Sequence, residues 1–131
     1  MRMLSQEDEK DDTAEVTWED QQRINTFSKI NTRLRGIEEK ITELKQEKEA
    51  LDDLSMELEL ADDDQPVMYK VGEAFLHLPH GRAMKRLEKD QNELDSELSR
   101  FSERAEECQK SMTELKVILY AKFGKAINLD E

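Results

Sequence analysis

Apolar residues recur at alternating intervals of three and four positions over two long stretches of the chain. In the second half the series has one polar member, Gln91, and runs through Met84, Leu87, Gln91, Leu94, Leu98, Phe101, Ala105, Cys108, Met112, Leu115 and Leu119. The first half repeats the spacing with two polar interruptions, through Phe27, Ile30, Leu34, Ile37, Ile41, Leu44, Lys48, Leu51, Ser55 and Leu58. This heptad spacing predicts two long coiled-coil helices, each with one apolar seam.

The two seams match each other if the helices run antiparallel. One register pairs Leu58 with Met84 and Ile30 with Met112, and it places every a position of one helix opposite a d position of the other. The centre of this register falls at Val71, between the two heptad stretches. The fold class is therefore expected to be mostly α, with a long antiparallel two-helix coiled coil.

Helix-breaking and helix-capping residues set the limits of the predicted elements. Pro66 and Pro79, the two prolines, both lie between the heptad stretches, where they end helices. Thr17 with Asp20 resembles a capping box and predicts a helix start, whereas Gly36 lies inside that helix at a cost of about 1 kcal/mol relative to alanine. The predicted organisation is a disordered acidic arm (1–16), helix 1 (17–61), a linker and β-hairpin (62–81), helix 2 (82–123) and a C-terminal tail (124–131).

The segment between the helices has β character. Residues 67–71 and 74–78 are short, apolar or β-prone runs joined across Gly72-Glu73, which predicts a β-hairpin. An isolated two-stranded hairpin is marginal in water and has two unpaired edges. We therefore expect it to pair with strands of other chains, so that the protein self-associates or joins a hetero-assembly.

Composition narrows the class of protein. Of 131 residues, 40% are charged and 36% hydrophobic, which is too little apolar content for an ordinary compact core. The net charge of -12 makes nucleic acid and anionic membranes poor partners, and the longest apolar run is too short to span a bilayer. The first residues lack a signal-peptide stretch, and a single cysteine cannot form an intramolecular disulfide. A reducing, cytoplasmic setting is expected, and an additional nuclear location is compatible with the same features.

The negative charge is concentrated in two segments, while the rest of the chain is nearly neutral. One is the N-terminal arm. It could limit the aggregation of complexes between this protein and a bound partner, or it could contact a basic surface. The other spans residues 52–64, which carry no basic residue and seven acidic ones: Asp52, Asp53, Glu57, Glu59, Asp62, Asp63 and Asp64. It lies beside the hairpin and could select basic neighbours in an assembly.

No catalytic, cofactor or metal constellation emerges from the sequence. His77 and His80 share an H-x-x-H spacing without a cysteine, so surface histidines are favoured over a zinc site. The run Asp62 to Asp64 lacks the alternating spacing of a calcium loop and is typical of a solvated helix end. Cys108 occupies a seam position, which favours a core residue over a nucleophile, and no glycine-rich phosphate motif is present.

Apolar residues away from the seam gather where helix 1 begins and helix 2 ends. They are Val16, Trp18, Ile24, Val117, Ile118, Tyr120, Phe123, Ile127 and Leu129. Either the C-terminal tail folds back over them, or they form an open tip that binds an apolar partner, the interpretation we favour. A second off-seam group, Leu54, Met56 and Leu60, lies at the hairpin end and would suit an assembly interface.

Several stretches resemble the β-type subunits of the prefoldin family. They are Trp18 to Asn25, Leu60 to Asp64, Tyr69 to Phe75, Leu115 to Gly124, and Ile127 to Leu129. The resemblance implies that hairpins of two α-type and four β-type chains join into β-barrels, from which six coiled coils extend. It also implies that the tips capture unfolded actin and tubulin without ATP and pass them to the cytosolic chaperonin.

The resemblance also assigns residues to these roles. With Ile24 and Ile118 added from the off-seam group, the predicted client-binding residues are Trp18, Ile24, Phe27, Ile118, Leu119, Tyr120 and Phe123. The predicted assembly residues are Val67, Met68, Tyr69, Val71, Phe75, Leu76 and Leu78. The competing hypothesis is a structural coiled-coil scaffold or tether that docks folded proteins. An enzyme is the weakest hypothesis, because the seam consumes most of the apolar residues.

Overall fold

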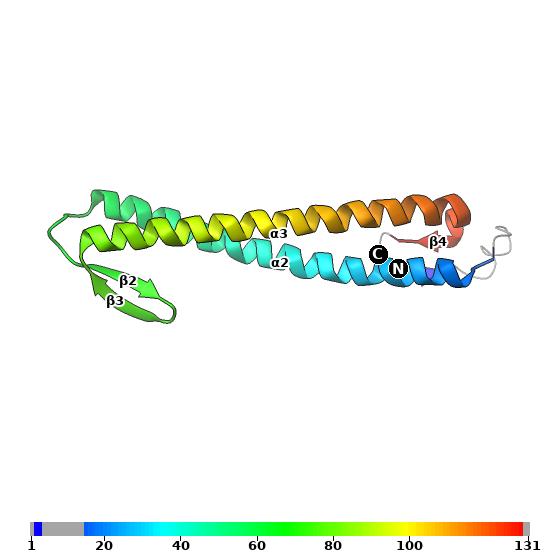
Figure 1. Ribbon diagram of the computed structural model, residues 1–131, viewed down its shortest axis with the longest axis horizontal. Coiled ribbons are helices and arrows are strands. Elements are labelled where there is room, and N and C mark those ends of the chain that lie inside the picture. Colours follow the sequence, from blue (N-terminus) through cyan, green and yellow to red (C-terminus); the bar gives the residue numbers. More distant parts are fainter. Residues whose placement is uncertain (1, 4–14, 130–131) are drawn as a thin grey trace. The chain divides into compact units, whose positions relative to one another are not determined.

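The computed structural model describes residues 2–3 and 15–129, with the backbone alone for residues 2, 3 and 125. Along the chain it contains β1 (Arg2–Met3), α2 (Trp18–Leu60), β2 (Val67–Val71), β3 (Ala74–Leu78), α3 (His80–Phe123), the 3-10 turn η1 (Gly124–Ala126) and β4 (Ile127–Asn128) (Figure 1). The predicted fold class is confirmed, since the chain forms two long helices with an antiparallel β-hairpin between them in the sequence. Most of the predicted disordered arm, at positions 4–14, lies outside the described residues.

The chain divides into two compact units, and both long helices contribute to each. Unit 1 comprises Met1–Glu38 and Glu103–Glu131, and unit 2 comprises Glu39–Ser102. Unit 1 therefore holds the start of α2, the end of α3 and the short elements β1, η1 and β4. Unit 2 holds the end of α2, the hairpin and the start of α3.

Local signals fix the ends of the helices. Before α2, the Asp20 amide donates to Thr17 Oγ1 at 3.2 Å and the Thr17 amide donates to Asp20 Oδ2 at 3.1 Å, so the predicted capping box is confirmed. At the same end of unit 1, α3 stops at Phe123, and the next residue, Gly124, adopts a positive φ of 54°. That conformation turns the chain back at the end of the helix.

In unit 2 the hairpin packs one face on its own helices. Strands β2 and β3 pair antiparallel, Val67 with Leu78 and Val71 with Ala74, and Gly72 has a φ of 63° in the turn. The buried core of this unit joins Tyr69 of β2 to side chains of both helices: Leu58, Ala83 and Leu87. This packing stabilises the hairpin within its own chain and leaves its other face open.

Unit 2 also contains the polar interruptions of the seam. Lys48 Nζ lies 3.0 Å from Asp95 Oδ1, and Gln91 donates to Asp52 Oδ1 at 3.4 Å. The hydrogen bond from Lys48 to Asp95 raises the pKa of the Lys48 ammonium. Both pairs are solvent-exposed, so they satisfy the polar seam positions but add little stability.

In unit 1 the seam follows the predicted antiparallel register. Leu34, Ile37 and Cys108 are buried between the helices. The register that pairs Ile30 with Met112 also aligns Asp20 with Lys122, and these two side chains are in contact. Within the described ranges, neither long helix holds a segment apolar enough to cross a membrane.

Candidate functional site

The end of unit 1, where α2 begins and α3 ends, is called the tip. Its buried residues come from both helices and from the segment after α3: Ile24, Phe27, Leu119, Phe123, Ala126, Ile127 and Leu129, together called the tip core. The C-terminal segment therefore folds back, and β4 lies beside the first turns of α2 (Figure 1). This is the first of the two arrangements that the sequence left open.

Other apolar side chains at the tip remain uncovered. Trp18 is 73% exposed, and Val16, Val117 and Ile118 are also exposed although they are large and apolar. These four are called the exposed tip residues. The tip thus combines a covered apolar core with an open apolar surface, and each of the two interpretations describes part of it.

The seven predicted client-binding residues fall into two groups. Trp18 and Ile118 are exposed and Tyr120 is half-buried, so a partner can reach them in the structure as it stands. The other four are buried in the tip core: Ile24, Phe27, Leu119 and Phe123. A partner can contact that second group only if the covering segment moves.

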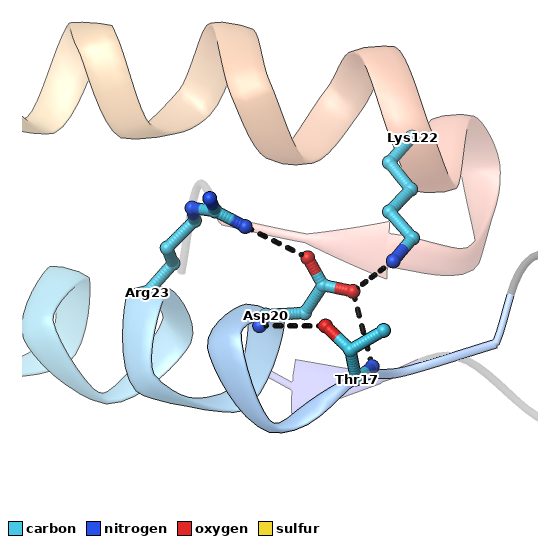
Figure 2. Close-up of polar contacts among 4 residues, drawn as sticks. All are labelled: Thr17, Asp20, Arg23 and Lys122. Carbon is cyan, nitrogen blue, oxygen red and sulfur yellow. Dashed lines mark hydrogen bonds and ion pairs between the residues drawn. The ribbon is translucent and has the colours of Figure 1, made fainter.

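A buried carboxylate joins the two helices at the tip (Figure 2). Asp20 is 1% exposed, and its side chain contacts Lys122 of α3 and Arg23 of α2, the latter at 3.1 Å. The hydrogen bond from Lys122 lowers the pKa of the Asp20 carboxyl from 3.8 to about 2, against the opposing effect of burial, with further help from the backbone of Thr17. Asp20 is therefore ionised and paired throughout the physiological pH range.

The sequence analysis found the helix cap but missed the contact with Lys122. The signal was present, because an acid in the first turn of one helix and a base in the last turn of the other align in the antiparallel register. It also missed that the Leu129 amide donates to the Tyr120 hydroxyl at 3.1 Å, which fastens the returning chain to α3. No sequence pattern predicts that contact.

The seven predicted assembly residues are likewise divided into a buried and an exposed group. Tyr69 is buried in unit 2, and Val67, Val71 and Leu78 pack against that core. The Tyr69 hydroxyl donates to Asp90 Oδ2 at 2.7 Å, and burial with this bond raises the pKa of the phenol. Met68, Phe75 and Leu76 are exposed and form the part of the hairpin available to another chain.

His80 and Cys108 make contacts within the fold, whereas His77 is exposed. The His80 ring lies 2.7 Å from the Leu58 carbonyl through Nε2 and 3.5 Å from Asp63 Oδ1 through Nδ1, so it ties the end of α2 to the start of α3. Cys108 is buried in the seam. The described part of the chain holds no group of three or more side chains suited to a metal ion. What the tip and hairpin offer a partner is apolar surface.

Comparisons with known proteins agree on one family. The family model described as "Prefoldin subunit" matches residues 21–126. The chain is 43% identical to prefoldin subunit 4 of Saccharomyces cerevisiae over 116 residues, which cover 88% of this chain and 90% of that protein. It is 36% identical to prefoldin subunit 4 of Homo sapiens over 116 residues, 88% of this chain and 87% of the human protein.

A solved structure agrees at the level of the fold. The prefoldin beta subunit from Thermococcus strain KS-1 superposes with a TM-score of 0.74 at 14% identity, covering 85% of this chain and 97% of that one. At 14% identity, the similarity between the two chains shows a common fold alone.

Proposed function

This chain belongs to the prefoldin family, and we propose that it serves as a β-type subunit of a hetero-hexameric, ATP-independent chaperone. Members of the family are non-enzymatic chaperone subunits that assemble with other prefoldin subunits. The proposed complex contains two α-type and four β-type chains. It acts in the cytoplasm, and the composition is compatible with a nuclear pool as well.

Assembly would use the open face of the hairpin. Met68 and Phe75 present apolar side chains there, and the outer edges of β2 and β3 can pair with strands of neighbouring subunits. Pairing of this kind would close the strands of several chains into β-barrels. The exposed Met56 and Leu60, near the end of α2, would extend the same interface.

Client capture would use the tip. Unfolded actin and tubulin expose apolar segments, and each tip offers weak apolar contacts through Trp18, Val117 and Ile118. Several tips acting together give avidity without a tight single site, so release to the cytosolic chaperonin requires no nucleotide hydrolysis. The observation that carries this proposal is the 73% exposure of Trp18 at a tip that also exposes Val117 and Ile118.

The test compares two sets of variants in the assembled complex. Trp18→Ser with Ile118→Ser removes exposed apolar surface from the tip, and Ala50→Ser changes an exposed apolar residue of α2 in unit 2. We expect the tip pair to weaken suppression of aggregation of denatured actin by about threefold, since one of the contributing arms is lost. Native mass spectrometry verifies that both complexes remain hexameric.

If intact hexamers of the tip variant suppress actin aggregation as well as the wild type does, the exposed tip residues do not bind the client. The same experiment separates the chaperone from a scaffold or tether. A tether would bind one folded partner at fixed stoichiometry and leave the aggregation of denatured protein unaffected.

A further inference from the structure

The segment after α3 covers the part of the tip that is richest in large apolar side chains. The described part of the C-terminal tail, residues 124–129, is called the tail from this point. Three of its side chains lie in the tip core at 2–3% exposure: Ala126, Ile127 and Leu129. Beneath them lie four helix residues: Ile24, Phe27, Leu119 and Phe123. Removal of the tail would expose to solvent the part of this apolar surface that the tail covers, next to the exposed tip residues.

After the 3-10 turn η1, residues 127–129 lie on this surface in an extended conformation. Ile127 has extended backbone angles, and β4 pairs with β1 in the antiparallel sense. Ile127 and Leu129 are buried while Asn128 between them is half-buried, which is the alternation of a strand with one face on a core. The helices therefore accept an extended segment with apolar side chains at every second position.

The tail is a short segment, held by three buried side chains, by the hydrogen bond from the Leu129 amide to Tyr120 and by the pairing of β4 with β1. Ordering six residues costs conformational entropy comparable with the gain from burying two aliphatic side chains and an alanine. The turn at Gly124 supplies a pivot, since a glycine with positive φ there changes direction without disturbing α3. Asp20 and Lys122 fasten the two helices to each other, so the surface beneath the tail keeps its shape when the tail departs.

We propose that the tail occupies the site of an extended client segment with apolar side chains at alternate positions, and that such a segment displaces it. This inference rests on the proposed chaperone function and specifies how the tip engages its client. Trp18 and Ile118 make the first contact, and the buried group then becomes available. The structure thereby accounts for four predicted client-binding residues being buried in the absence of a client.

The test uses the assembled complex and a probe made from the tail itself. The probe is a fluorescent synthetic peptide with the sequence of residues 124–131, and a scrambled peptide of equal composition is the control. The variant Ile127→Ser with Leu129→Ser keeps the tail but weakens its hold, and Ala50→Ser, at an exposed position of α2 in unit 2, is the control. We expect the tail variant to bind the probe about tenfold more tightly than wild type, because an internal competitor that occupies its site nine-tenths of the time lowers affinity by that factor.

Equal or weaker binding by the tail variant overturns the proposal, as does equal binding of the scrambled peptide. If the double substitution loosens the tip itself, a chain ending at Phe123 provides the second measurement. Adding the probe should restore slow amide hydrogen exchange to residues 20–30 of that truncated chain in its complex, and failure to restore it overturns the proposal. Suppression of actin aggregation by the wild-type complex is measured alongside. If the wild-type complex does not suppress actin aggregation, the proposed chaperone function is wrong. If it does suppress aggregation but the peptide experiments give negative results, only the proposal about the tail is wrong.

Discussion

At the scale of single residues, Asp20 links the start of α2 to the end of α3 through one carboxylate. The acid lies in the first turn of its helix and Lys122 in the last turn of the other, so each charge is at the helix end that favours its sign. Because Asp20 is almost fully buried, an unpaired charge there would be costly. Loss of either partner is therefore expected to destabilise the tip.

The lowered pKa of Asp20 predicts how this contribution changes with pH. A carboxyl with a pKa of about 2 when folded and 3.8 when unfolded stabilises the fold fully above pH 4 and loses its effect as pH falls through 2. Asp20→Asn should therefore lower the free energy of unfolding at pH 7 by about 2 kcal/mol. The difference from wild type should vanish near pH 2, as measured by urea unfolding followed by circular dichroism.

The neighbouring acid Glu19 provides the control for this experiment. It is exposed and lies in the same turn, so Glu19→Gln should leave the pH profile close to that of wild type. A constant difference between Asp20→Asn and wild type from pH 7 to pH 2 would contradict the role of the charge.

At the scale of elements, glycines at two positions have opposite consequences for stability. Gly36 lies inside α2 and is exposed, and a Cβ added there would meet no atom within 4 Å. Gly72 has equally open surroundings but forms the hairpin turn with a φ of 63°. The two sites therefore separate helix propensity from backbone strain.

Gly36→Ala should stabilise the chain by about 1 kcal/mol, because alanine loses less conformational entropy in a helix. Gly72→Ala should destabilise it by about 1 kcal/mol, since an L-residue is strained in the left-handed region. Urea midpoints of the two variants measure both effects. A destabilising Gly36→Ala would mean that the α2 backbone at this position is not an ordinary helix.

The sequence predicted the elements well because their signals are local or periodic. The heptad series gave both helices and their antiparallel register, and Thr17 with Asp20 gave the start of α2. The tail could not be decided in the same way. Whether Ile127 and Leu129 cover Phe27 and Phe123 depends on the fit between segments far apart in the chain, and burial of Tyr69 depends on the position of Asp90 on α3.

At the scale of the whole molecule, the segment that precedes the hairpin combines exposed apolar side chains with a high density of acidic residues. The last turn of α2 carries no basic residue, although the negative end of a helix favours one. Residues 52–64 thus hold seven acids and no base, together with the exposed Met56 and Leu60. A neighbouring subunit with basic side chains would supply the missing charge on assembly.

A charge on the open face of the hairpin should prevent that assembly. Phe75→Asp places a carboxylate where the proposed interface buries an aromatic ring, so we expect co-purification with partner subunits to fall at least about tenfold. The isolated variant should keep its helix content, because Phe75 is 61% exposed and lies outside the buried core of unit 2. Recovery of intact hexamers by native mass spectrometry would contradict the assembly role of this face.

The pairing of Asp20 with Lys122 also has a consequence for the order of folding. The two residues are 102 positions apart in the sequence, whereas the strands of the hairpin are joined by a two-residue turn. Loop-closure entropy favours contacts near the hairpin first, and each pair of helical turns that forms shortens the loop left for the next. The tip then closes last during folding, and by the same reasoning it is the part of the chain that opens first in a local fluctuation.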